Sequence, residues 1–298
     1  MAPMTPLRKR MFEDMQLRNL ASKTQSNYIH YISGLAKFYM TSPEHLGFEE
    51  IRDYQLYLIN ERRYSAESVN QFVSAVKFLY GTTLEMPWPE GTLTRMRVPQ
   101  RLPVILSPEE VSLFFDCIPT VRYRVAIMAA YGAGLRVSEV VSLKVSDVDS
   151  KRMVIRVEQG KGKKDRYTLL SPRLLEVLRF WWRSTRPEGK DALLFPAWRT
   201  GKHLSAATLQ QACRDATKRA GLTKRVTPHS MRHAFATHLL ESGTDIRVIQ
   251  ALLGHTRIET TARYTQVSPL LISQIHSPLD RLDPRFGAGA KPVRKAKR

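Results

Sequence analysis

The sequence is poor in cysteine and contains no long apolar run. Its 298 residues include two cysteines, Cys117 and Cys213, whose positions match no metal-binding spacing. We interpret both as small apolar core residues, which suits a reducing compartment better than a disulfide framework. No apolar stretch is long enough to span a bilayer, and residues 1–6 lack the apolar core of a signal peptide. We therefore expect a cytoplasmic protein that is not embedded in a membrane.

Acidic residues are few compared with basic ones. Lys and Arg total 47 against 27 Asp and Glu, which gives a formal net charge of +20 and an isoelectric point near 10.2. Such an excess of positive charge indicates a polyanionic partner. Nucleic acid is the first candidate and an anionic membrane surface is the second. The length allows two domains, and an apolar fraction of 43% is ordinary for a globular protein.

Amphipathic helical patterns fill the first part of the chain. Apolar residues recur at spacings of three and four after Ser22, from Ile51 to Leu58 and from Val69 to Tyr80, where Gly81 ends the pattern. These stripes predict a helical domain over residues 1–90. Basic side chains on its outer faces contact either DNA or water. We predict that three of them contact DNA: Arg62, Arg63 and Lys77.

A segment without helical or strand period follows at residues 91–106, with one glycine and two prolines. We predict a linker there and count its Arg101 among the DNA contacts. Ser107-Pro108-Glu109-Glu110 then has the serine, proline and glutamate of a capped helix start. A second domain is expected over residues 107–283. The basic end, residues 284–298, is expected to be a disordered tail that is either solubilising or attracted to DNA.

The second half mixes helices with a hairpin. Met153 to Val157 alternates and is β-branched, Gly160-Lys161-Gly162 supplies turn residues, and Tyr167 to Leu170 is the expected returning strand. The fold class we predict is therefore mainly α with a small antiparallel β-sheet. One helix should place Leu175, Leu178 and Trp182 on its core face. The helices are expected at residues 121–133, 137–143, 172–184, 205–220, 228–241 and 244–253.

Two side chains of one predicted helix suit an anion. His229 and Arg232 are three residues apart and share a helix face, and Pro228 puts both in the first turn, where N–H groups attract phosphate. A capped helix with surface His and Arg is the simpler reading of this pair alone. The spacing of four to His233, with His238 beyond, also suits zinc, but no cysteine or carboxylate completes such a site, so we expect no metal.

Further candidates lie upstream and downstream. Arg136 follows a Gly-Ala-Gly-Leu turn, and Glu139 is placed to brace it. Lys161 lies at the tip of the hairpin, where it could reach a DNA groove or donate a proton to a leaving oxygen. His255 and Tyr264, each of which alone would be a structural residue, close the set. Three more basic residues of the hairpin are expected to contact DNA: Lys163, Lys164 and Arg166.

The order of these residues is more specific than any one of them. The surrounding sequences are Gly-Leu-Arg-Val-Ser-Glu, Gly-Lys-Gly-Lys-Lys-Asp-Arg, Pro-His-Ser-Met-Arg-His, Leu-Leu-Gly-His-Thr and Tyr-Thr. Over residues 10–275 this pattern resembles the tyrosine recombinase, or phage integrase, family, most closely its Xer-like and integron- or transposon-borne branches. All six catalytic positions of that family are filled: Arg136, Lys161, His229, Arg232, His255 and Tyr264.

The resemblance implies a helical core-binding (SAM-like) domain and a catalytic domain that form a C-shaped clamp on double-stranded DNA. It implies strand cleavage by Tyr264 through a 3′-phosphotyrosyl intermediate and a Holliday junction, without ATP, metal or another cofactor. Arg136, Arg232 and His255 would hold the phosphate, and Lys161 would protonate the leaving oxygen. His229 would either assist the proton transfer at the tyrosine or orient the phosphate.

The assembly implied is a homo-tetramer on two paired sites. Residues 271–275 would belong to a C-terminal helix exchanged between protomers, although packing on its own domain is the simpler alternative. Location at the nucleoid follows from such an activity. The sequence leaves open whether accessory proteins take part, and whether the outcome is integration, excision, transposition or dimer resolution.

Two other functions remain to be separated from recombination. A type IB topoisomerase shares the phosphotyrosine chemistry but relaxes DNA without exchanging partners. A basic architectural protein with vestigial motifs would bind DNA and form no covalent product. If Tyr264 were not the nucleophile, Tyr131 and Tyr167 would be the substitutes.

Overall fold

The structure, a computed structural model, describes residues 5–86, 93–99, 104–158, 165–189, 191–197, 203–255, 257–262 and 264–265. The chain divides into two compact units, Met1–Gln100 (the N-terminal unit) and Arg101–Arg298 (the C-terminal unit). The point of division lies inside the predicted linker, whereas the exact domain bounds given above stay a prediction.

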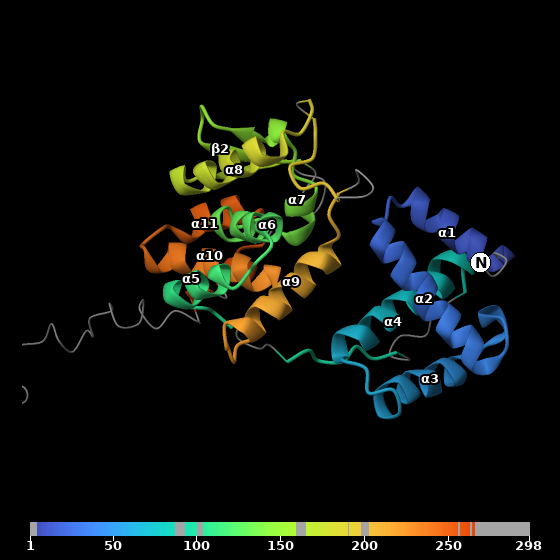
Figure 1. The fold of residues 1–298 in the computed structure, drawn as a ribbon. Coiled ribbons are helices and arrows are strands. Elements are labelled where there is room, and N and C mark those ends of the chain that lie inside the picture. Colours follow the sequence, from blue (N-terminus) through green and yellow to red (C-terminus); the bar gives the residue numbers. More distant parts are fainter. Residues whose placement is uncertain are drawn as a thin grey trace, which may run out of the picture. The chain divides into compact units, whose positions relative to one another are not determined.

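The described part of the N-terminal unit is helical (Figure 1). Its elements are α1 (Pro6–Leu17), α2 (Ser22–Tyr39), the 3-10 turn η1 (Pro43–His45), α3 (Phe48–Asn60), α4 (Ala66–Phe78) and the π-helical turn η2 (Leu79–Thr83). Helix α2 packs along α4, and Leu35, Ile51 and Phe72 are fully buried between the helices. The expected amphipathic stripes are therefore confirmed as the core of this unit.

The first part of the predicted linker is bound to the N-terminal unit. Leu93 is buried in its core. Gln55 Nε2 donates to the carbonyl of Thr94 at 3.0 Å, and Asn70 exchanges two hydrogen bonds with the backbone of Met96 at 2.8 and 2.9 Å. Side-chain amides thus satisfy backbone groups of a segment without regular structure, which no periodic pattern in the sequence could indicate.

The C-terminal unit combines helices with a three-stranded antiparallel sheet in the order β1-β2-β3, which confirms the predicted fold class. The strands are β1 (Val148–Asp149), β2 (Val154–Val157) and β3 (Arg166–Leu169). Helix α6 packs against both α8 and α10 (Figure 1). The helices are α5 (Pro108–Asp116), α6 (Val121–Gly132), α7 (Val137–Val141), α8 (Pro172–Thr185), α9 (Ala206–Arg219), α10 (Pro228–Glu241), α11 (Ile246–Leu253) and α12 (Ile258–Ala262), with the 3-10 turn η3 (Val145–Asp147) before the sheet.

The core face of α8 differs from the prediction by one residue. Leu175 and Leu178 are buried as expected, but Trp182 is 45% exposed and Trp181 is buried instead. The Trp181 indole N–H donates to the carbonyl of Leu194 at 2.7 Å, so a buried tryptophan keeps its polar group paired. Two adjacent tryptophans fit a helical stripe equally well, and only this tertiary contact selects between them.

None of the described helices is both long enough and apolar enough to cross a membrane. The two cysteines are unpaired: Cys213 is buried in the core, whereas Cys117 is only partly buried at the end of α5. The capped start predicted at Ser107 is confirmed, because its hydroxyl accepts from Glu110 N and its own N–H donates to the Glu110 carboxylate.

Candidate active site

Local sequence fixes where α10 and α11 begin and end. Thr227 caps α10, its hydroxyl accepting from Ser230 N at 3.1 Å, and Pro228 opens the first turn. Gly254 ends α11 in the left-handed conformation, with a φ of +63° that favours glycine. The backbone carbonyl of Leu253, at the end of α11, accepts a hydrogen bond from Arg232 of α10.

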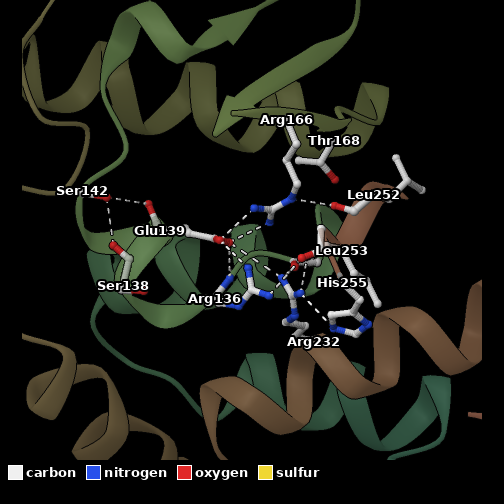
Figure 2. Close-up of polar contacts among 12 residues, drawn as sticks. Arg136, Ser138, Glu139, Ser142, Arg166, Thr168, Arg232, Leu252, Leu253 and His255 are labelled. Carbon is white, nitrogen blue, oxygen red and sulfur yellow. Dashed lines mark hydrogen bonds and ion pairs between the residues drawn. The ribbon is translucent and has the colours of Figure 1, made fainter. Parts of the chain in front are cut away.

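Glu139, on α7, is the centre of the site (Figure 2). Its carboxylate accepts the backbone N–H of Arg136 at 2.7 Å and the Arg136 guanidinium at 2.8 Å, which confirms the expected brace. Burial of Glu139 opposes its ionisation. Hydrogen bonds from Arg166 and Arg136 outweigh that effect and lower the pKa of this carboxyl to about 2, so it is anionic at neutral pH.

Arg166 reaches the same carboxylate from the first residue of β3 (Figure 2). Two of its guanidinium nitrogens donate to Glu139, each at 2.8 Å, and its Nε donates to the carbonyl of Leu252 at 2.9 Å. The side chain is 9% exposed. A planar guanidinium that pairs two-for-two with a carboxylate holds that carboxylate in one orientation. Arg166 thus faces inward, whereas the sequence led us to expect a DNA contact.

Arg232 comes from α10 and is almost fully buried. Its guanidinium donates to the carbonyls of Gly134 and Leu253, and one of its nitrogens lies 3.7 Å from Glu139. Burial, followed by the neighbouring cation Arg136, lowers the pKa of this side chain to about 9. It still carries its charge at neutral pH, and the carbonyl oxygens around it replace water as hydrogen-bond acceptors.

His255 lies directly after the glycine that ends α11. Arg232 Nη2 donates to its Nε2 at 3.3 Å, and its Nδ1 lies 3.0 Å from the hydroxyl of Thr261. Because an arginine can only donate, these contacts assign the ring proton to Nδ1. Burial and the nearby Arg232 and Arg136 lower the pKa of this imidazole to about 4, so it is neutral at neutral pH.

The cluster has a net positive charge. Three guanidinium groups surround one carboxylate: Arg136, Arg166 and Arg232 around Glu139. An excess of two positive charges therefore remains, which suits a phosphodiester and the additional negative charge that develops while the phosphorus is attacked.

Tyr264 is 3% exposed and belongs to a small apolar cluster with Phe235, Ile249 and Leu253. Its ring lies nearly parallel to that of His255, with centroids 6.4 Å apart and an interplanar angle of 18°. The phenol therefore lies beside the histidine that Arg232 contacts. Tyr264 and the basic cluster belong to the same unit of the chain.

A further histidine contacts the phenol. His233 Nδ1 lies 3.0 Å from Tyr264 Oη. The ring of His229, one turn earlier on α10, stands edge-on to that of His233 with centroids 4.3 Å apart. The structure thus brings six of the predicted residues into one site with His233: Arg136, Glu139, His229, Arg232, His255 and Tyr264.

The remaining predicted residues fall into two groups. Arg62, Arg63 and Lys77 are exposed on the N-terminal unit. Four more fall outside the described residues: Arg101, Lys161, Lys163 and Lys164. In the described ranges, no group of three or more His, Cys, Asp or Glu side chains could hold a metal ion.

The two alternative tyrosines differ from Tyr264 in their surroundings. Tyr167 is 51% exposed on β3. Tyr131 Oη lies 2.8 Å from His238 Nδ1, whose Nε2 donates to the backbone carbonyl of Leu106. The His238 contact of Tyr131 does not involve the Arg136 and Arg232 cluster.

Three side chains of the site were not assigned these roles from the sequence. Thr261, His233 and the inward-facing Arg166 each depend on contacts between distant segments. The spacing of four between His229 and His233 was a usable signal, because it puts both rings on the face of α10 that meets Tyr264. From the sequence alone, this spacing indicates only a metal-binding pattern.

Comparison with known proteins agrees with this geometry. The phage integrase family model matches residues 105–270, and the phage integrase N-terminal SAM-like domain model matches residues 7–90. A putative integrase/recombinase of Sinorhizobium fredii is 47% identical over 280 residues, covering 94% of this chain and 90% of that protein. The tyrosine recombinase XerA of Thermococcus onnurineus is 45% identical over 175 residues, covering 58% of this chain and 61% of that protein.

A solved structure has a similar fold. The XerH site-specific recombinase, in a post-cleavage complex with its palindromic difH substrate, matches with a TM-score of 0.67 and 20% identity, covering 87% of this chain and 81% of that one. The family models and the curated relatives carry the assignment, and the structural likeness supports the fold. The chain therefore belongs to the phage integrase family and is a tyrosine-type site-specific DNA recombinase.

Proposed function

We propose that this protein exchanges strands between two defined DNA sites, with Tyr264 as the nucleophile of each cleavage. The observation that carries the proposal is the packing of the Tyr264 ring beside His255, which is bound to Arg232 within the Glu139 cluster. A phosphate held by Arg136 and Arg232 would lie next to the phenol oxygen.

In the proposed reaction, Tyr264 Oη attacks the phosphorus in line with the 5′-oxygen. The O–P bond to tyrosine forms while the bond to the 5′-oxygen breaks, and the protein stays joined to the 3′-phosphate. Arg136 and Arg232 stabilise the negative charge on the non-bridging oxygens, where preorganised donors lower the barrier most. Lys161 gives the leaving oxygen its proton. Attack by a 5′-hydroxyl reverses the steps and needs no external energy source.

His255 has to change its hydrogen bonding in this scheme. Its Nε2 accepts from Arg232 in the structure, and a donor to the phosphate is needed there. A phosphate oxygen that takes over the Arg232 N–H would release Nε2, and the ring proton could then move from Nδ1 to Nε2. The hydroxyl of Thr261, which can donate as well as accept, remains a partner for Nδ1 in both forms.

The assembly we propose is four protomers on two paired sites, each protomer contacting the duplex with both of its units. Residues 271–275 would pass to a neighbouring protomer, and the Holliday junction would be the intermediate between the two strand exchanges. Exposed Arg62, Arg63 and Lys77 supply positive charge for the phosphate backbone on the N-terminal unit. Location at the nucleoid follows from these contacts.

The test begins with the native target. Covalent complexes trapped on genomic DNA, after sequencing of the attached ends, give the site, and two copies are then placed on one plasmid. The wild type should resolve the plasmid into two circles in EDTA, and Tyr264→Phe should bind the site but produce none. Relaxation without resolution would support a type IB topoisomerase, and binding with no product from either protein would support an architectural protein.

A further inference from the structure

Tyr264 has a second histidine neighbour besides His255. His233 Nδ1 lies 3.0 Å from Tyr264 Oη, within hydrogen-bonding distance, and the two ring centroids are 5.5 Å apart. The aromatic part of Tyr264 is packed in the apolar cluster with Phe235 and Leu253. The polar tip of a nearly buried tyrosine is thus directed at an imidazole nitrogen, which is the geometry in which a proton can pass between them.

We propose that His233 accepts the phenol proton of Tyr264 during cleavage and returns it during rejoining. The inference deepens the proposed function and rests on it. In the resting protein His233 also holds the phenol oxygen in a fixed position. It is a different residue from His229, to which the sequence alone had assigned assistance at the tyrosine.

The step balances without a further reactant. The Tyr264 O–H bond breaks as its oxygen bonds to phosphorus, and the proton moves to His233 Nδ1 to give an imidazolium. The 5′-oxygen leaves with the electron pair of its bond to phosphorus and takes a proton from the general acid. In rejoining, the 5′-hydroxyl attacks phosphorus and gives its proton back to that acid, while the tyrosine oxygen leaves and recovers its proton from His233.

The other histidine beside Tyr264 is less suited to this task. His255 is already engaged at both nitrogens, with Arg232 donating to Nε2 and Thr261 next to Nδ1. Burial, together with the cations around it, lowers its pKa to about 4, so it binds a proton poorly. His233 instead has the phenol oxygen as a partner of Nδ1. We infer that the two histidines divide the work, His255 at the phosphate and His233 at the nucleophile.

The ionisable groups around His233 have to be considered together. His229 stands edge-on to it on the same helix, and Tyr264 lies against it from the segment after α12. Across the Tyr264 ring is His255, which contacts Arg232. Cations near a protonated His233 would disfavour it, whereas the bound phosphate would favour it. The proton transfer is therefore expected only when DNA occupies the site.

The same helix offers a matched control. His238 Nδ1 lies 2.8 Å from Tyr131 Oη, so α10 carries a second histidine–tyrosine pair of nearly the same geometry. Its other nitrogen is bound to the backbone carbonyl of Leu106, and neither residue has a proposed role in the reaction. A change at His238 reports what the loss of such a pair does to the fold of α10.

The experiment measures the rate of covalent adduct formation against pH, on a nicked oligonucleotide of the trapped site, for wild type, His233→Asn, His233→Ala and His238→Asn. Asparagine can still hydrogen-bond the phenol but cannot take its proton. We expect His233→Asn to cleave about 10²-fold or more slowly and to lose the acid limb of the profile. Added imidazole should accelerate His233→Ala and leave the other variants unchanged, and His238→Asn should keep the wild-type profile.

A wild-type rate and pH profile in His233→Asn would overturn the inference and reduce His233 to a packing residue. If the wild type formed no adduct that depends on Tyr264, the proposed function itself would fail, which is a separate result. If the His233 variants do not fold, the pH profile of adduct formation is measured on the otherwise native protein with a fluorinated tyrosine, of lower pKa, at position 264. The acid limb of the pH profile stays at the same pH if it reports the titration of His233. It moves to lower pH with the phenol pKa if no base accepts the proton.

Discussion

Glu139 shows how one buried side chain organises several others. It accepts from Arg136 and Arg166 and lies 3.7 Å from Arg232, so a single carboxylate fixes three guanidinium groups. A buried carboxylate with these partners is stable only as long as its partners remain, because a charge left uncompensated in the interior is costly. Each member of the cluster therefore supports the position of the others.

Arg166→Met tests this dependence at constant side-chain volume. The change removes two hydrogen bonds to Glu139 and one to the Leu252 carbonyl. We expect it to lower the free energy of unfolding by about 3–5 kcal/mol, as for other broken buried pairs. Chemical denaturation measures the effect. The control is Arg152→Met, whose exposed guanidinium lies over the Tyr167 ring and should cost about 1 kcal/mol or less. Equal losses for both would contradict the supporting role.

His255 should make stability depend on pH in a defined window. The folded protein lowers its pKa from 6.5 to about 4, so between these values the unfolded chain binds more protons. Its contribution is fully present above pH 6.5 and is lost as the pH falls toward 4. The free energy of unfolding of His255→Gln should vary less over this window than that of wild type, measured by urea titration at several pH values. Parallel curves for the two proteins would show that burial does not hold His255 neutral.

Some contacts of individual side chains could be predicted from the sequence, and others could not. Arg136 and Glu139, three apart at a helix start, were expected to pair and do so. Arg166 was expected to contact DNA as one of the basic residues of the hairpin. In the structure β3 begins one residue before the expected Tyr167, with Arg166 opposite Val157, and its guanidinium turns inward. The pairing register of a short strand depends on its partner strand. The alternation of side chains within a strand of only four residues does not determine that register.

At the scale of elements, the end of α11 joins the helices of the site to the sheet. Gly254 allows the chain to turn at a φ of +63°, and the Arg166 side chain crosses directly over it, so that a Cβ there would lie 2.7 Å from Arg166 Cδ. The carbonyls of Leu252 and Leu253 bind Arg166 and Arg232. A helix end that leaves its last carbonyls available thus supplies acceptors to two arginines.

Gly254→Ala separates backbone strain from this close approach. Gly221 has the same φ of +63°, but a Cβ there would meet nothing within 4 Å. Gly221→Ala should cost only the left-handed conformation, about 1–2 kcal/mol. Gly254→Ala should cost about 1–3 kcal/mol more, because it also displaces Arg166, and it should slow cleavage where Gly221→Ala does not. Denaturation and adduct rates measure both effects, and equal behaviour of the two variants would exclude the steric contribution.

Helix periodicity predicted most of the elements but not how they meet. The core faces of α2 and α4 were found from spacing alone, and Ser107 was found from its capping sequence. The pairing of His233 with Tyr264 was not found, because it depends on the chain after α12 folding back onto α10. Local patterns describe one element at a time, and a site built from α7, β3, α10 and α11 requires their tertiary contacts.

At the scale of the whole molecule, the charge of +20 should govern DNA binding. Each phosphate contact releases counterions, so the logarithm of the affinity should fall linearly with the logarithm of salt concentration, by about 0.9 per contact. Arg62→Ala and Lys77→Ala should each reduce that slope by about 1. Fluorescence anisotropy at several salt concentrations measures it. Lys9→Ala, whose ammonium lies near Glu13, is the control and should leave the slope unchanged.

The central claim is that Tyr264 becomes covalently joined to DNA. The direct measurement is mass spectrometry of the peptides released from the wild-type protein after it has been trapped on a nicked copy of its own site. A 3′-phosphate nucleotide attached to Tyr264, absent from Tyr264→Phe and retained in Tyr131→Phe and Tyr167→Phe, is the result we predict. Attachment to Tyr131, Tyr167 or another residue, or an adduct that survives in Tyr264→Phe, would contradict it.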